Sequence, residues 1–158
     1  MFRELARKNK QISREECAEL LTRETRGYLA VHGDGDYPYV TPMNHFYDAE
    51  DGCIYFHCGK SGHRLDALGR SDKVSFCVCE QGEREEGDWA YHVRSVVVFG
   101  RIEIIDDLSE IVRVTARLSR KFTEDEDYIN QEIQQYGQAT LLLKLRPEHI
   151  CGKLVKEA

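Results

Sequence analysis

The sequence lacks the features that would place it outside the ordinary globular class. No apolar run approaches the roughly 18 residues that suggest a membrane span. The first 14 residues carry basic side chains where a secretion signal would have an apolar segment. Only three prolines interrupt the 158 residues, and no internal repeat or low-complexity segment is visible. These absences predict one globular domain, residues 1–158, that works in the cytoplasm.

An excess of basic charge is also missing. The chain has 22 Lys and Arg against 28 Asp and Glu, which gives a formal net charge of −6 with histidine neutral. General nucleic-acid binders usually carry a basic surface that displaces counterions from phosphates, so this class is excluded. The 41% hydrophobic content supports an ordinary buried core and argues against a disordered chain.

Six cysteines are present, but the sequence gives no sign of an oxidising environment. In a reducing compartment thiols usually serve as small apolar fillers, and we expect that role here. Cys77 and Cys79 would point to the same side of a strand, and their C-x-C spacing matches no common structural zinc site. We therefore predict no metal.

The hydrophobic pattern predicts a mostly β domain between helices. A first helix begins at Ser13, where Ser13 and Glu16 have capping-box spacing, and it should end near Arg26-Gly27. Short strands separated by turn-like segments favour an antiparallel barrel or sandwich. Gly100 marks a bulge or bend in the longest strand. The predicted strands are 28–32, 39–47, 53–58, 73–79, 89–105 and 139–145, the last ending before Pro147, and helices are predicted near 108–122 and 126–136.

The segment from Tyr55 to Leu65 passes from a strand through a glycine-containing loop into a short helix. Such a junction presents backbone N–H groups and the positive end of the helix dipole, and Lys60, His63 and Arg64 add donors. The pattern is neither a Walker motif nor a dinucleotide fingerprint. It predicts a phosphate site, with a loop of solvated charges as the alternative.

Two further segments have polar groups in unusual strand positions. Pro42 interrupts a strand and leaves neighbouring backbone groups free for a ligand, although an ordinary edge strand explains it as well. Arg94 and Ser95 stand beside a run of valines. A charged group there needs a partner, which is either a ligand phosphate or a carboxylate in a structural ion pair.

Several motifs, in this order, together resemble one family. The resemblance runs from Met1 to Lys153, and the chain is similar to the Nim branch, the 5-nitroimidazole resistance family, of the pyridoxamine-phosphate-oxidase-like flavoproteins. The motifs are Tyr37-Pro38-Tyr39, Pro42, Tyr55-Phe56-His57, Gly59-Lys60-Ser61-Gly62-His63-Arg64-Leu65-Asp66, Lys73-Val74-Ser75-Phe76-Cys77-Val78 and Arg94-Ser95-Val96-Val97-Val98-Phe99-Gly100.

The resemblance implies a split β-barrel that forms a homodimer and holds FMN in clefts between the subunits. It implies that the isoalloxazine lies along Thr41 to Asn44 and that Phe56 to Cys58 line the same pocket. It also implies that Arg94 and Ser95 complete the site from across the interface. The implied cofactor-binding residues are Thr41, Pro42, Met43, Asn44, Phe56, His57, Cys58, Lys60, Gly62, His63, Arg64, Arg94 and Ser95.

His57 is the predicted catalytic or substrate-contacting residue, because the resemblance places this position close to the flavin. A neutral imidazole can donate a proton, and an imidazolium can stabilise negative charge on a reduced nitro group. The alternative is a packed histidine at a strand end. Met43, Asn44 and His45 depart from the apolar or hydroxyl residues common in related chains, so the substrate side of the pocket is expected to differ.

These observations favour an FMN-dependent oxidoreductase that takes electrons from a reduced nicotinamide or another donor. Its substrate would be a small oxidised molecule such as a nitroimidazole or another nitroaromatic. One alternative is a non-catalytic flavin- or haem-binding module, since the six histidines allow haem ligation. Another is pyridoxamine phosphate oxidase activity, but the Arg- and His-bearing C-terminal segment that it requires is not seen.

Overall fold

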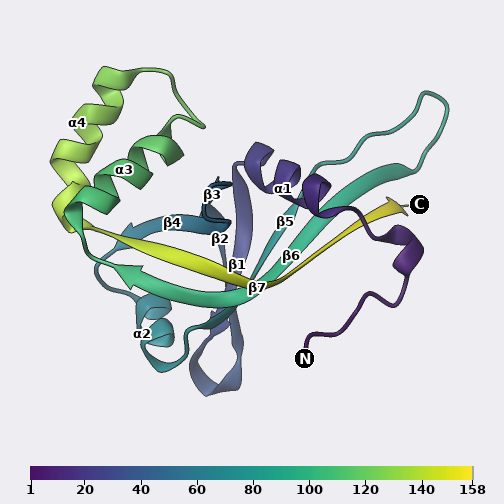
Figure 1. Cartoon of the computed structure of the whole chain (residues 1–158), viewed down its shortest axis with the longest axis horizontal. Coiled ribbons are helices and arrows are strands. Elements are labelled where there is room, and N and C mark those ends of the chain that lie inside the picture. The colour runs from purple at the N-terminus through teal and green to yellow at the C-terminus, as the bar shows by residue number, and fades with distance from the viewer. Residues whose placement is uncertain (158) are drawn as a thin grey trace.

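Seven strands form one antiparallel sheet in the computed structural model, which describes residues 1–157 (Figure 1). Their order in the sheet is β2-β1-β5-β6-β7-β4-β3. Four α-helices lie at its margins. The bounds are α1 Arg14–Arg23, β1 Arg26–His32, β2 Pro38–Asn44, β3 Phe46–Asp48, β4 Cys53–Gly59, α2 His63–Arg70, β5 Lys73–Cys79, β6 Tyr91–Ile105, α3 Leu108–Ser119, α4 Glu126–Tyr136 and β7 Thr140–Glu157.

The sheet closes on itself at His45. Strands β2 and β3 lie at opposite edges of the sheet, yet only His45 separates them in the chain, so the two edges must meet there. We predicted a single strand over 39–47. It is instead divided, because its first half pairs with β1 and its second half with β4. This division turns a curled sheet into the predicted mostly β split barrel.

His45 is fully buried at this closure. Its Nε2 lies 2.7 Å from the carbonyl oxygen of Leu21 and must carry the hydrogen, because a carbonyl only accepts. Burial, reinforced by the positive charge of Lys121, lowers the pKa of the imidazole to about 4. Lys121 donates to the backbone oxygens of Glu24 and His45, at 2.7 and 2.9 Å. His45 is therefore a neutral structural residue.

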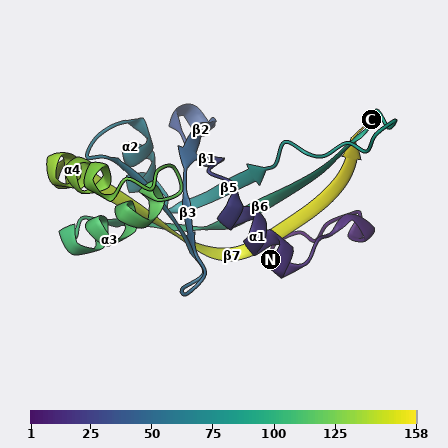
Figure 2. The same ribbon diagram turned by 90° about the horizontal axis from the view of Figure 1, so that it is seen from above.

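Strands β6 and β7 pair along their whole length and form the long curved ribbon seen in Figure 2. The prediction that the last strand ends before Pro147 is wrong, since β7 continues to Glu157. A register shift between Phe99 and Gly100 lies opposite Pro147, and proline is tolerated at such irregularities. A Cβ on Gly100 would collide with the backbone oxygen of Arg146. The predicted bulge at Gly100 is confirmed.

The predicted helices are present with shifted ends. Ser13 caps α1 and forms the expected capping box with Glu16. The helix ends at Arg23, before the predicted Arg26-Gly27, because the chain turns extended at Glu24 and β1 begins at Arg26. Helices α3 and α4 lie side by side at one end of the barrel in both views (Figures 1 and 2).

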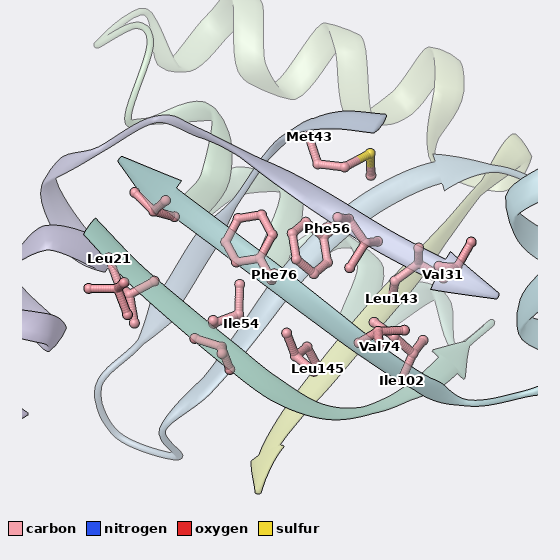
Figure 3. Packing of buried hydrophobic residues seen from close by; sticks show 14 of the residues in the cluster. Leu21, Val31, Met43, Ile54, Phe56, Val74, Phe76, Ile102, Leu143 and Leu145 are labelled. Carbon is pink, nitrogen blue, oxygen red and sulfur yellow. The ribbon is translucent and has the colours of Figure 1, made fainter. Parts of the chain in front are cut away.

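Strand β4 alternates between two apolar cores. Ile54 and Phe56 point into the barrel, where Phe56 packs edge-on against Phe76 at 4.9 Å between ring centroids (Figure 3). Cys53 and Tyr55 point the other way and pack beneath α3. His57 follows on this outer side of β4, beyond the apolar packing, and its side chain is exposed. The period-2 alternation therefore puts His57 outside the barrel.

The cysteines form no disulfide in the described chain. Val74, Phe76 and Val78 are buried on the inner face of β5, which leaves Cys77 and Cys79 together on the outer face, as predicted. No helix within residues 1–157 is both long and apolar enough to cross a membrane.

Candidate functional site

The junction between β4 and α2 has the geometry of an anion site. Gly62 precedes α2 with φ +129°, a conformation that side chains rarely adopt, and no side chain caps the helix. A Cβ placed on Gly59 or Gly62 would meet nothing within 4 Å. The first N–H groups of α2 have no side-chain acceptor and lie at the positive end of the helix dipole.

Arg64, in the first turn of α2, has an unused donor. Its Nη2 donates to Thr41 Oγ1 at 3.2 Å, whereas its Nε is buried and has no hydrogen-bond partner in the described chain. An unsatisfied buried donor costs about 1–3 kcal/mol, and more when it is charged. An anion beside Arg64 would remove this cost. The Arg64–Thr41 contact also joins the predicted phosphate loop to strand β2.

Lys60 and His63 lie around the same junction but are occupied by weak surface contacts. Lys60 Nζ lies 2.9 Å from Asp106 Oδ1, in a pair whose side chains are 46% and 63% exposed. The His63 ring stacks on Tyr39 at 4.1 Å between centroids. Exposed ion pairs contribute 0–1 kcal/mol, so a phosphate can compete for Lys60.

A pocket of about 340 Å³ lies beside this junction, and we call it the β2–β4 pocket. Arg26, Pro42, Met43, Asn44 and His57 line it. It brings together two sequence motifs that the prediction had placed on one ligand. Arg26 was missed, although its Nε donates to Asn44 Oδ1 at 3.0 Å. Only the β1–β2 register, which pairs Arg26 with Asn44, reveals it.

His57 also lines a second pocket of about 320 Å³, which we call the α3–α4 pocket. It lies between β4 and the two helices, and its polar and aromatic lining residues are His57, Thr115, Ser119, Tyr128, Glu132, Tyr136 and Thr140. Although the His57 side chain is accessible, the surrounding protein atoms lower the pKa of its imidazole. His57 therefore stands neutral where the two pockets meet.

Other predicted residues face the barrel interior. Phe56 is fully buried, and Met43, at 8% exposure, reaches the β2–β4 pocket from the core side. Cys58 packs against the core, and burial raises the pKa of its thiol. Of these three side chains only Met43 reaches the pocket, whereas Pro42, Asn44 and His57 present its polar or exposed surface.

Arg94 and Ser95 lie far from Arg64 within one chain. Arg94 donates from its backbone and its side chain to Glu80, at 2.8 and 3.2 Å. Lys60 and Asp106 lie next to the far end of β6, which is Ile105. Arg94 is eleven residues from Ile105, and this separation corresponds to roughly 35 Å along a strand. One chain does not bring the two arginines together, so a contribution across a subunit interface stays a prediction.

The geometry above agrees with a comparison of the sequence against models of protein families. The model described as pyridoxamine 5'-phosphate oxidase matches residues 13–154. The chain belongs to the pyridoxamine 5'-phosphate oxidase family. This match covers every strand and helix that carries the candidate site. A comparison with curated protein sequences gave no significant match.

Solved structures show the same fold as this family member. A candidate 5-nitroimidazole antibiotic resistance protein from Bacteroides thetaiotaomicron superposes with a TM-score of 0.76 at 20% identity, covering 93% of this chain and 87% of that one. The conserved hypothetical protein Rv2991 from Mycobacterium tuberculosis gives 0.79 at 20% identity, with 95% and 89% covered. An FAD-binding protein from Mesorhizobium loti gives 0.66 at 24% identity, with 92% and 97% covered.

Proposed function

We propose that this protein binds FMN and works in the cytoplasm as an oxidoreductase that reduces a small oxidised substrate, such as a nitroimidazole or another nitroaromatic. The observation that carries the proposal is the buried, unpartnered Nε of Arg64 at the uncapped end of α2. The names of two structural neighbours, one a candidate 5-nitroimidazole resistance protein and one an FAD-binding protein, support it.

Each part of the site has a physical role in this proposal. Arg64 and the backbone N–H groups of α2 hold the cofactor phosphate, and Lys60 adds charge once it leaves Asp106. The β2–β4 pocket positions the ring system beside His57. Bound flavin supplies the electron-transfer chemistry. The neutral His57 imidazole donates a hydrogen bond or a proton to a substrate held next to it.

We also propose that the protein is a homodimer. The outer face of the sheet carries exposed Tyr28 and Val40, which are 55% and 54% accessible, and Phe99, which is 38% accessible. Strand register places these side chains on one face of β2, β1 and β6, with β5 between β1 and β6, and Ser95 lies on the same face of β6 as Phe99. A second copy covering this apolar face would bring its own Ser95 toward the first copy.

The test is the spectrum of the natively purified protein. We expect flavin absorbance and release of FMN on denaturation, followed by oxidation of NADH or NADPH when a nitroimidazole is supplied without oxygen. A protein that neither carries flavin nor takes up added FMN would contradict the proposal. Sedimentation of a monomer with FMN still tightly bound would contradict the dimer.

A further inference from the structure

One face of α4 carries three side chains toward the α3–α4 pocket. Tyr128, Glu132 and Tyr136 follow one another at intervals of four residues, which places them on the same side of a helix. All three line the pocket, together with Thr115 and Ser119 of α3. The pocket thus has one carboxylate between two aromatic rings, with hydroxyl groups opposite and His57 at the side next to the β2–β4 pocket.

Glu132 has no partner for its charge within residues 1–157. No hydrogen bond or ion pair involves its side chain, and the same is true of Ser119 and His57. The nearby basic residues are committed elsewhere, because Arg120 holds Glu126 at 2.7 Å and Lys121 donates to two backbone oxygens. Polar groups that converge in a pocket without partners are available to a ligand.

We propose that the α3–α4 pocket binds a small planar organic cation, such as an amidinium, that the substrate carries beside its reducible group, and that Glu132 determines this preference. The carboxylate pairs with the positive charge, while the Tyr128 and Tyr136 rings attract a cation through their π faces. The role of the pocket as the substrate side rests on the proposed flavin function, because it borders the proposed flavin only through His57.

Two features favour a cation over an anion. Burial among protein atoms lowers the pKa of His57, so its imidazole adds no positive charge to the pocket at neutral pH. The cationic groups of the site, Lys60 and Arg64, lie instead at the α2 end, beside the phosphate position. The two ends of the site therefore have opposite charge preferences, which orients a substrate with its positive end away from the cofactor phosphate.

Binding of three matched probes tests this inference on the natively purified protein. Calorimetry with benzamidinium, benzamide and benzoate compares a cation, a neutral molecule and an anion of nearly the same shape. We expect benzamidinium to bind at least tenfold more tightly than benzoate. Glu132→Gln should weaken benzamidinium at least tenfold and change benzamide less than twofold. Asp127→Asn, which removes the same charge from an exposed position on α4, should leave both affinities unchanged.

Tyr128 provides a second variant that does not endanger the fold, because its side chain is 53% exposed. Tyr128→Ala should weaken benzamidinium about threefold or more, while Tyr128→Phe keeps the ring and the affinity. Equal binding of benzoate and benzamidinium, or an unchanged affinity in Glu132→Gln, would overturn the inference even if flavin is bound. Glu132-dependent binding to a protein that takes up no flavin would support the cation pocket and refute the proposed oxidoreductase.

Discussion

Arg64 and Arg94 were both predicted to belong to the cofactor site, and the structure gives them different surroundings. Arg94 is held by Glu80, whose carboxylate also accepts from Arg23 at 2.5 Å. Arg64 contacts one hydroxyl group and keeps a buried donor unused. The first guanidinium has partners in its own chain, and the second still needs one.

The difference separates polar groups that hold the fold from polar groups that await a ligand. Glu80, Arg94 and Lys121 are paired inside the chain, and His45 is held there through its Nε2, so we expect their replacement to lower stability. Arg64 has an unused donor and the side chains of His57 and Glu132 have no partner among residues 1–157, so we expect their replacement to change binding or turnover instead. This distinction can be tested one residue at a time.

The largest expected effect is the loss of folding stability that His45 causes in acid. Its pKa is about 4 in the folded protein against an ordinary value of 6.5, so between these values the unfolded chain binds a proton that the folded chain excludes. Stability is therefore highest above pH 6.5 and falls toward pH 4, by about 3 kcal/mol from this group. Urea unfolding at a series of pH values measures this loss.

The matched variants for this prediction are His45→Gln and His32→Gln. Glutamine keeps an N–H donor for the carbonyl of Leu21 but does not titrate, so His45→Gln should remove most of the loss between pH 6.5 and 4. His32 is exposed, and its replacement should leave the pH dependence as it is. If the stability of His45→Gln falls with pH as steeply as that of the wild type, the buried imidazole is not responsible for the loss.

The next effect concerns flavin affinity. Arg64→Met removes a charge-assisted contact to the phosphate, and we expect FMN to bind on the order of 100-fold more weakly with little change in unfolding free energy. Fluorescence titration of flavin-free protein measures the affinity. Arg70→Met is the control, because Arg70 is on the same helix but pairs with Asp34 at 2.7 Å on the surface. Equal losses of FMN affinity in both variants would show that the total positive charge of the helix matters and not a direct contact of Arg64 with the phosphate.

A smaller effect on stability is expected at Glu80, whose charge is already paired with Arg94 and Arg23. Burial raises the pKa of Glu80, but hydrogen bonds from Arg94 and Arg23 outweigh it and hold the pKa below its usual range. Its stabilisation is present above the ordinary glutamate pKa and is lost as the pH falls through the lower, folded value. Glu80→Gln should cost about 2 kcal/mol in urea unfolding at pH 7. A tenfold loss of FMN affinity would instead show that this cluster reaches the cofactor of a partner subunit.

The smallest expected change in stability is at His57. Its side chain is accessible and makes no hydrogen bond in residues 1–157, so His57→Gln should alter the unfolding free energy by no more than about 0.5 kcal/mol. Turnover of a nitroimidazole should nevertheless fall by about tenfold or more, with FMN still bound. A variant that is fully active, or one that is much less stable, would place His57 among the residues that only pack.

The sequence predicted those parts of the molecule that depend on local pattern. The capping box at Ser13, the strand 73–79 and the bulge at Gly100 follow from short-range chemistry and were found as expected. The end of β7 was missed because a proline within a strand is acceptable only opposite an irregularity, and pairing partners cannot be seen in one sequence.

The candidate site shows the same limit. Lys60 to Arg64 lie in one motif and were found together, whereas Arg26 enters the site only through its pairing with Asn44. The spacing of Tyr128, Glu132 and Tyr136 predicts a shared face of α4, but the sequence does not indicate that this face packs beside His57. Residue 158 lies outside the described part of the chain.

The contact made by Lys121 has a consequence for how this protein can be altered. Its ammonium holds two main-chain oxygens, those of residues 24 and 45, so this contact between the end of α3 and the barrel depends on the identity of only one side chain. Every amino acid supplies a carbonyl at the other two positions. The tyrosines and the glutamate on α4 can thus be exchanged to suit another substrate while Lys121, the Arg117–Asp48 ion pair and the apolar packing of α3 still attach these helices to the barrel.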